Sequence, residues 1–249
     1  MKFVFLSLFP EFIEQAGDFS ILGRGRKAGL FELSVINPRD YTTDRHRSAD
    51  DTPCGGGAGM VLKPEPFSLA IDEARKTAPE GVVIALTPGG RPLTQNIVKE
   101  LAAGKKDLIF VCGHYEGFDQ RILDKTDLQL SVGDYVVTGG ELPALIIMDA
   151  VARYIPGVLG KEASTEEESF SDYLLEYPQY TRPVDYQGAK VPEVLLSGNH
   201  AAIKKWRRKE AIRATYKLRP DLLSKLKFDE EDGKLFLEVL NEEKTTQSE

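Results

Sequence analysis

Cysteine is scarce in this sequence: only Cys54 and Cys112 occur among its 249 residues, and they do not form a CxxC motif. Two cysteines are too few for a disulfide scaffold, which excludes the small disulfide-rich secreted proteins. The scarcity is typical of a protein from a reducing compartment, and we expect a cytoplasmic location.

Long hydrophobic runs are lacking as well. The apolar stretch at residues 3–9 is too short to cross a bilayer, and no small-residue cleavage site follows it. No other stretch reaches the roughly 18 apolar residues that a membrane span requires. We therefore expect no membrane partner.

Positive charge is in the minority, with 32 Lys and Arg against 39 Asp and Glu and a formal net charge of -7. The acidic total argues against a uniformly basic nucleic-acid binder. The length allows one large domain, or a medium domain with a small one. The chain has no internal repeat, and its changes in composition predict three parts: residues 1–160, an acidic segment at 161–185, and residues 186–249.

The first part alternates short apolar strands with helices. Strands are expected at residues 3–9, 31–36, 82–86 and 108–112, and helices from Pro10, at 64–76, at 93–103 with Thr94 as N-cap, and at 141–154. Strands that are apolar throughout are typical of a sheet covered on both faces. The pattern predicts an α/β domain with a parallel sheet.

The segment at 161–185 combines several glutamates with tyrosines and prolines, which indicates a linker or a mobile active-site segment. Helices are then expected from Asn199, as N-cap, to Tyr216, and at residues 220–226 and 229–240. The C-terminal part is therefore predicted to be a small all-helical domain.

Charge is segregated within this C-terminal part. Residues 204–227 hold ten basic and two acidic residues, a local charge of +8, whereas residues 229–249 are acidic. A solvated helix face is the ordinary explanation of such a run. Trp206 and Tyr216 lie among the charges, and this combination of cations with aromatic rings favours a nucleic-acid surface.

A glycine-rich loop spans residues 55–59, with four glycines in five residues. Such a loop lets backbone N–H groups approach a phosphate or a base closely, although a flexible surface loop explains it equally well. It is not a P-loop, because Met60 and Val61 stand where Lys and Ser or Thr would be required. The charged stretch at 44–51 before it modestly favours a polar-substrate site.

Three further loops follow expected strands, at residues 87–90, 113–117 and 132–140. Ligands bind beyond the carboxyl ends of the strands in parallel α/β sheets. Tight turns explain the glycines of these loops, but they do not explain Tyr115, Glu116 and Tyr135 beside them. The three loops together predict a site for a flat ring.

Other kinds of site find little support. The three histidines are too scattered for zinc, no HExxH motif or Cys/His cluster occurs, and no GxSxG motif indicates a nucleophilic serine. We predict no metal ligands. Arg153 closes an apolar helix, where a cation complements the helix dipole. The carboxylates at residues 166–168 and 172 are those of an ordinary solvated face.

An ordered set of motifs nevertheless makes the chain resemble a known family. The motifs are SLFP at residues 7–10, RDY at 39–41, DRHR at 44–47, GGGAGM at 55–60, GHYEG at 113–117, GDYV at 133–136, GGELPA at 139–144, IPGV at 155–158, YTRP at 180–183 and VLLSGNH at 194–200. In this set, which covers residues 3 to about 223, the chain resembles the bacterial tRNA (guanine-N1-)-methyltransferases of the SPOUT class.

The resemblance implies a parallel α/β domain with a deep C-terminal trefoil knot, an exception to the usual absence of knots. It implies S-adenosylmethionine as methyl donor and a homodimer in which both subunits build each active site. The substrate would be tRNA, methylated at N1 of the guanine immediately 3′ of the anticodon. Residues 1–160 would bind the donor, 161–185 would carry the catalytic acid, and 186–249 would bind tRNA.

The family's functional positions fall on specific residues here. The resemblance assigns the donor pocket to Leu86, Thr87, Pro88, Gly113, Tyr115, Glu116, Val132, Gly133, Asp134, Tyr135, Val136, Val137, Gly139, Gly140 and Pro143. We assign substrate binding to Asp50, Gly55, Gly56, Gly57, Gly59, Lys204, Lys205, Arg207 and Arg208. Arg153 would stabilise the guanine O6 and Glu168 would be the general base.

The chain departs from the family pattern in several places. The family more often has Asp where Glu168 stands, which leaves Asp172 as the alternative base, and Asp is also common at the position of Glu176. His114 replaces a usual Arg, which puts a role for that side chain in doubt. The stretch at 87–90 replaces a usual Ser-Pro-Gln-Gly. A divalent ion such as Mg²⁺ is left open, because no set of residues demands one.

Three other functions compete with this one. A knotted methyltransferase could act on another RNA, although the acidic cluster favours a base nitrogen that has a proton to lose. A non-catalytic RNA-binding module would need only the basic helix, and it leaves the strand-end loops without a role. A nucleotide-dependent α/β enzyme is disfavoured by the missing phosphate-binding motifs.

Overall fold

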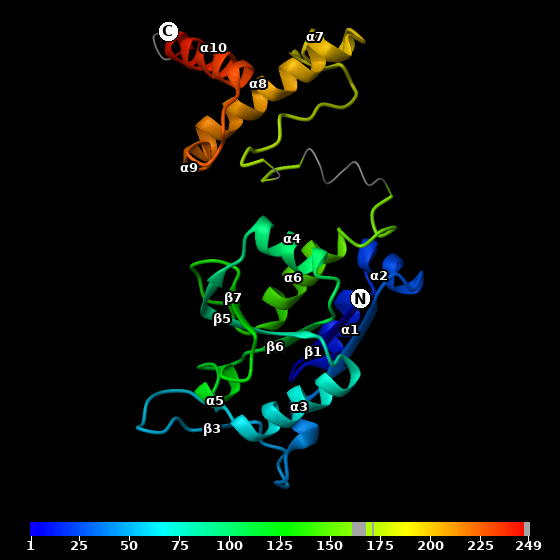
Figure 1. Cartoon of the computed structure of the whole chain (residues 1–249), viewed down its shortest axis with the longest axis vertical. Helices are drawn as coiled ribbons and strands as arrows, with labels where there is room; N and C mark the ends of the chain where they lie inside the picture. The colour runs from blue at the N-terminus through cyan, green and yellow to red at the C-terminus, as the bar shows by residue number, and fades with distance from the viewer. Residues whose placement is uncertain (161–167, 171, 247–249) are drawn as a thin grey trace. The chain divides into compact units, whose positions relative to one another are not determined.

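The computed structural model describes residues 1–160, 168–170 and 172–246 (Figure 1). The chain divides into two compact units, Met1–Glu162 and Ala163–Glu249. The glutamates at 166 and 167 of the predicted acidic segment lie outside the described residues. None of the helices in the described part of the chain has the length and apolar character that a bilayer crossing requires.

The first unit is built on a five-stranded sheet in the order β2-β1-β6-β5-β7, in which all pairs are parallel. The strands are β1 (Lys2–Leu6), β2 (Glu32–Ile36), β5 (Val82–Pro92), β6 (Leu108–Cys112) and β7 (Leu128–Ser131). The predicted α/β class with a parallel sheet is thereby confirmed.

Both faces of the sheet are buried, which explains the unbroken apolar runs. Successive residues of β1 point to opposite faces, so Phe3 and Phe5 join one core cluster while Val4 and Leu6 join the other. All four are fully buried. A strand with water on one face would have alternated with polar residues instead.

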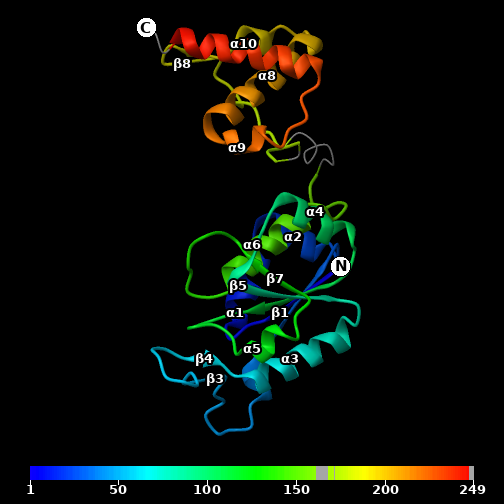
Figure 2. The same cartoon turned by 60° about the vertical axis from the view of Figure 1, so that its left-hand side comes forward.

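Helices cover each face of the sheet (Figures 1 and 2). On one face lie α1 (Pro10–Gly17), α4 (Gln95–Ala103) and α6 (Glu141–Ala152), and on the other α3 (Pro64–Thr77) and α5 (Gln120–Leu123). The unit also contains α2 (Ser20–Lys27), the 3₁₀ helix η1 (Pro38–Tyr41), β3 (Asp50–Asp51) and β4 (Val61–Leu62). Thr94 caps α4 as predicted, because its hydroxyl accepts a hydrogen bond from the Ile97 N–H.

One prediction about this sheet is wrong. The strand expected at residues 82–86 does not end in a turn but continues to Pro92, and its register with β7 shifts between Leu86 and Arg91, both of which pair with Leu130. Residues 87–90 bulge out, and the pairing then resumes. Gly90 permits this close return, because a Cβ there would lie 2.6 Å from the Leu130 backbone.

The second unit packs helices around a small apolar core. Its elements are β8 (Asp185–Tyr186), β9 (Ala189–Lys190), α7 (Glu193–Leu196), α8 (His200–Leu218), α9 (Pro220–Leu223) and α10 (Glu230–Thr246). The core is formed by Leu174, Ala211, Ile212, Leu226, Leu235 and Val239. Asn199 caps α8 as predicted, accepting from the Ala202 N–H.

The prediction of an all-helical C-terminal part is wrong in one detail. β8 and β9 form a two-stranded antiparallel hairpin. Its turn residues Gln187 and Gly188 have φ angles of 54° and 89°, the left-handed conformation that tight hairpin turns require. Strands of two residues are too short to show an alternating pattern in the sequence.

Candidate active site

A cavity of about 330 Å³ lies beyond the carboxyl ends of β6 and β7 and beside the bulge within β5. Its walls come from residues 86–88 at the bulge of β5, from the loops at 113–118 and 132–140 that follow β6 and β7, and from the start of α6. All of the residues assigned to the donor pocket line it except Gly133 and Asp134. The structure therefore brings the residues of the three loops together around one space.

Backbone contacts hold two of these loops side by side. His114 and Gly139 form an antiparallel bridge, and the Gly140 N–H donates to the Gly113 carbonyl at 2.7 Å. A Cβ on Gly140 would lie 2.6 Å from the Gly113 nitrogen and 2.8 Å from the Cys112 Cα. Only glycine fits such an approach, and the wall of the cavity depends on it.

Apolar side chains stand at the mouth of the cavity. The exposed fractions are 49% for Tyr115, 56% for Tyr135 and 83% for Val136. The Tyr135 ring lies 2.5 Å from where a Cβ on Gly133 would be, so Gly133 makes room for that ring although it does not line the cavity. Exposed aromatic and aliphatic groups around a hollow are typical of a ligand site.

Three polar side chains, those of Ser7, His114 and Glu141, lie beside the same loops. Ser7, at the end of β1, donates its hydroxyl hydrogen to Glu141 Oε1 at 2.8 Å, and both side chains are buried. His114 Nδ1 is buried and has no hydrogen-bond partner among the described residues. A Cβ on Gly139 would meet Glu141 Oε2 at 2.4 Å and His114 Nδ1 at 2.7 Å, so both groups press on this glycine.

The residue pattern alone does not indicate that Ser7, His114 and Glu141 lie together. Ser7 follows an apolar strand and Glu141 opens a helix directly after two glycines, so each has a strand-end or helix-start signal. Their pairing spans 134 positions in the sequence and depends on β1 lying next to β6. Burial and the nearby Glu141 carboxylate raise the pKa of the Cys112 thiol, which keeps this thiol protonated.

The glycine-rich loop is attached to the rim of the cavity. The Glu116 N–H donates to the Met60 carbonyl at 3.0 Å, and the Leu62 N–H donates to the Gly117 carbonyl at 2.9 Å. A Cβ on Gly59 would meet the Glu116 carboxylate at 2.3 Å. The assigned substrate-binding glycines thus stand next to the assigned donor pocket, within one unit.

The other glycines of this loop have open space around them. Gly55, Gly56 and Gly57 all have positive φ angles, and a Cβ on Gly55 or Gly56 would meet nothing within 4 Å. Asp50 lies at the base of the loop in β3, where it pairs with Leu62. The loop therefore has both a fixed base and an exposed tip.

The assigned catalytic residues belong to different units. Arg153 is the C-cap of α6 in the first unit, where it is half-buried. Glu168 and Asp172 belong to the second unit, and both line a cleft of about 910 Å³ against the first half of α8. In the described part of the chain, no group of three or more His, Cys, Asp or Glu side chains is arranged to hold a metal ion.

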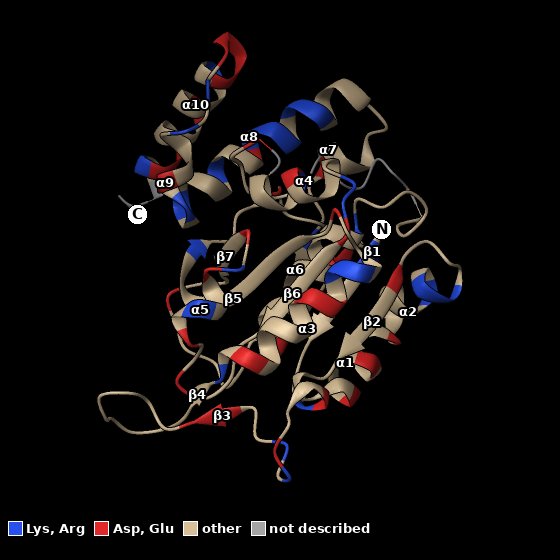
Figure 3. Ribbon diagram, turned by 60° about the horizontal axis from the view of Figure 1, so that its bottom comes forward, with Lys and Arg blue, Asp and Glu red and all other residues tan. Residues whose placement is uncertain are grey.

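Basic residues extend along α8 in the second unit (Figure 3). Arg208 is directed at protein carboxylates: its Nε and Nη2 atoms donate to Asp232 at 2.7 and 2.6 Å, and its Nη1 atom donates to Asp172 at 3.2 Å. Of the four α8 cations assigned to substrate binding, Arg208 thus has a structural partner in Asp232, whose side chain is only 5% exposed.

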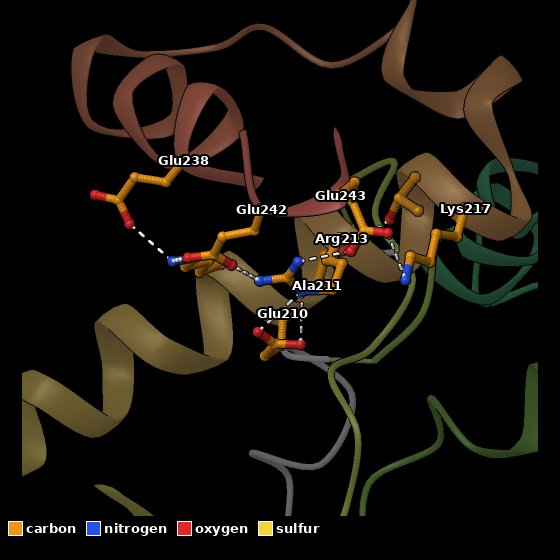
Figure 4. Close-up of polar contacts among 9 residues, drawn as sticks. Glu210, Ala211, Arg213, Lys217, Glu238, Glu242 and Glu243 are labelled. Atoms are coloured by element: carbon orange, nitrogen blue, oxygen red, sulfur yellow. Dashed lines mark hydrogen bonds and ion pairs between the residues drawn. The ribbon is translucent and has the colours of Figure 1, made fainter. Parts of the chain in front are cut away.

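Cations in the second half of α8 form ion pairs with glutamates of the acidic helix α10 (Figure 4). Lys209 pairs with Glu238 and Glu242, and Arg213 pairs with Glu242 and Glu243. Hydrogen bonds from Lys209 and Arg213 hold the pKa of Glu242 below its usual value. The acidic tail therefore offsets the basic segment by direct ion pairs, and not only in the total charge.

Taken together, these features define an α/β protein with a ligand cavity at the strand ends of a parallel sheet and a separate unit that carries basic residues. A family model described as tRNA (Guanine-1)-methyltransferase TrmD matches residues 1–225. The chain belongs to this family, which confirms the resemblance found in the sequence.

Curated relatives agree over nearly the whole chain. The chain is 50% identical over 240 residues to the tRNA (guanine-N(1)-)-methyltransferase of Syntrophomonas wolfei, covering 96% of this chain and 97% of the relative. It is 52% identical over 232 residues to that of an Anaeromyxobacter species, covering 92% and 93%. It is 50% identical over 235 residues to that of Clostridium perfringens, covering 94% and 98%.

Proposed function

We propose that the protein transfers a methyl group from S-adenosylmethionine to N1 of a guanine in tRNA, at the base immediately 3′ of the anticodon. The observation that carries the proposal is the match to the methyltransferase family over residues 1–225, together with a cavity walled by the strand-end loops of the same stretch. We further propose that it acts in the cytoplasm, where its substrate is.

The cavity suits the proposed donor. Its volume of about 330 Å³ falls within the range of roughly 300–1,000 Å³ that is common for ligand pockets. Gly113, Gly139 and Gly140 leave backbone groups accessible to a purine edge, while Tyr115 and Val137 offer apolar surface to its faces. When bound, the donor supplies a methyl group on a positively charged sulfur. The interlocked loops at 113–117 and 132–140 are where we propose the trefoil knot.

We propose that Glu168 acts as the general base. N1 of guanine carries a proton and is a poor nucleophile, so a carboxylate must accept this proton as the N1–CH₃ bond forms and the bond between methyl and sulfur breaks. General-base help of this kind contributes typically about 10²–10⁴-fold. Asp172, which accepts a hydrogen bond from Arg208, is the alternative.

Arg153 would stabilise the negative charge that develops on O6 as the N1 proton leaves. A fixed cation at such a position contributes most where water is excluded. The glycine-rich loop would close over the guanine, since its base at Gly59 and Met60 is attached to the rim of the donor cavity. Turning the target base out of its stack would give it access to this cavity.

We propose that two copies of the chain form a homodimer with shared active sites. Large apolar side chains are exposed where α1 and α6 pack together: Phe9, Phe12, Leu142 and Ile146 are 41%, 44%, 51% and 47% exposed. A second copy would cover this surface and bring its own catalytic residues to the cavity. Light scattering on Ile146→Glu tests it: a monomer is expected, and an unchanged dimer would contradict this interface.

The function is tested by single-turnover methyl transfer to tRNA transcripts, with and without Mg²⁺. Glu168→Ala and Arg153→Ala are expected to lower the rate by about 10²-fold or more. If Glu168→Ala retains the wild-type rate while Asp172→Ala loses it, the base is Asp172. A transcript with adenine in place of the target guanine serves as the control and should receive no methyl group.

A further inference from the structure

The two halves of α8 differ in what their cations contact. From Arg208 to the end of the helix, Arg208, Lys209, Arg213 and Lys217 all form ion pairs with carboxylates of the second unit. In the first half, Lys204 and Lys205 form none with the described residues, and both line the cleft of about 910 Å³. Lys204 and Lys205 are both exposed, and the Lys205 charge also helps to lower the pKa of Glu238 on α10. Both cations are therefore accessible to a ligand.

Aromatic rings gather at this same half of the helix. The Tyr180 and Trp206 rings lie 6.3 Å apart at an interplanar angle of 55°, and Tyr180 is 48% exposed. One residue further along, the Arg207 guanidinium lies 4.8 Å above the Tyr177 ring, and both residues line the cleft. These rings and planar groups form what we call the aromatic platform: Tyr177, Tyr180, Trp206 and Arg207.

Core packing does not account for this arrangement. The core of the second unit is formed by other residues, to which only Tyr177 of the platform adds a partly buried ring. Tyr216, the other aromatic residue in the basic segment, differs from these because its ring meets Phe236 of α10 edge-on at 5.8 Å, although it remains 37% exposed. Tyr180 is exposed, and Tyr177, Trp206 and Arg207 are partly buried. An exposed ring beside partly exposed planar groups and exposed cations suits a ligand that has flat rings and negative charge.

We propose that the aromatic platform is a binding site for an unpaired nucleobase of the RNA substrate, with Lys204 and Lys205 contacting the adjoining phosphates. This inference rests on the proposed tRNA substrate and adds the part of the RNA that the second unit recognises. Stacking uses the π-face that every base has, so the site selects unpaired loop nucleotides over a duplex stem and tolerates different bases. Tyr177 holds the Arg207 plane in a stacking position before RNA binds.

The test uses Trp206 as its own reporter, because it is the single tryptophan of the chain. The full-length protein is titrated with a tRNA transcript, with a short single-stranded RNA and with a blunt RNA duplex of equal length. Trp206 emission is expected to be quenched by the first two and much less by the duplex. Tyr180→Leu and Trp206→Leu are expected to weaken filter binding of the single strand roughly 5- to 150-fold.

Two matched variants serve as controls. Tyr186→Leu removes a tyrosine of the β8–β9 hairpin that is 64% exposed, and Lys190→Gln removes an exposed cation of the same hairpin, outside the cleft and outside the basic segment at 204–227. Both are expected to bind the single strand as the wild type does. Circular dichroism on each variant checks that the second unit is folded.

The outcomes separate this inference from the proposed function. If the wild type methylates tRNA but Trp206 emission does not change and the platform variants bind normally, the platform is not a base site and the inference is wrong. Equal quenching by the duplex would also overturn it. If the single strand quenches Trp206 but no tRNA is methylated, the stacking site stands and the proposed function fails.

Discussion

Replacing Arg208 by methionine tests whether this residue holds the second unit together. Arg208 makes two hydrogen bonds to Asp232, whose side chain is 5% exposed, while its own side chain is 32% exposed. Arg208→Met keeps much of the aliphatic stem and removes the charge. The Asp232 carboxylate is then left buried without its ionic partner.

The cost follows from that burial. Removing one partner of a buried ion pair destabilises by about 3–5 kcal/mol, because the other charge stays uncompensated. Water reaches the Arg208 side of this pair, so we expect about 2–3 kcal/mol. Asp172 also loses a partner, but it is 65% exposed and its contribution is small. Removing both charges in Arg208→Met/Asp232→Leu should recover most of the loss.

Urea unfolding followed by Trp206 fluorescence measures the effect, since the reporter lies in the same unit as the pair. A loss of about 2–3 kcal/mol lowers the midpoint by roughly 1–2 M urea. The double variant should unfold near the wild-type midpoint. If Arg208→Met unfolds as the wild type does but binds tRNA less tightly, Arg208 acts on the RNA and the structural explanation is refuted.

Three further predictions follow from the first unit. Gly140→Ala places a Cβ 2.6 Å from a backbone nitrogen of the neighbouring loop and should weaken S-adenosylmethionine binding at least about tenfold by calorimetry. Ser7→Ala removes the donor to the buried Glu141 carboxylate and should lower the free energy of unfolding by about 2 kcal/mol in urea. Asp119, whose pKa is lowered to about 2 by hydrogen bonds from Arg121, contributes stability above about pH 4 that is lost as pH falls toward 2; Asp119→Asn should flatten this part of an unfolding-versus-pH curve.

Much of the fold can be predicted from the sequence because buried positions require apolar residues. β6 is apolar throughout and β1 is apolar from Phe3 onward, since both faces of the sheet are covered. Thr94 and Asn199 are polar residues placed directly before helices, and both caps form. These features depend on neighbours in the sequence, so the sequence alone is sufficient to find them.

Helix α2 shows where local propensity misleads. Its sequence, SILGRGRK, holds two glycines in eight residues, which disfavours a helix. Gly23 and Gly25 are nevertheless required, because a Cβ would lie 2.0 Å from the Asp18 carbonyl oxygen in the first case and 2.8 Å from the Phe31 ring in the second. Tertiary packing decides the conformation here, and the sequence pattern does not contain that information.

Some features of the candidate site can likewise be predicted from the sequence, and others depend on tertiary packing. The gathering of three loops at one edge follows from the rule that parallel strands end on the same side. The Ser7–Glu141 pair and the closeness of His114 to it depend on which strands become neighbours. In the second unit, the basic run is visible in the sequence. Which of its cations form ion pairs with α10 depends on how α8 and α10 pack together.

Mass spectrometry of tRNA after incubation with the enzyme and S-adenosylmethionine tests the central claim most directly. Nuclease fragments of a tRNA transcript should gain one methyl group at the guanine immediately 3′ of the anticodon, and the modified nucleoside should be N1-methylguanosine. The Glu168→Ala and Arg153→Ala proteins should give little of this product in the same time. A wild-type protein that leaves tRNA unmethylated, or that methylates a different atom or position, would contradict the account.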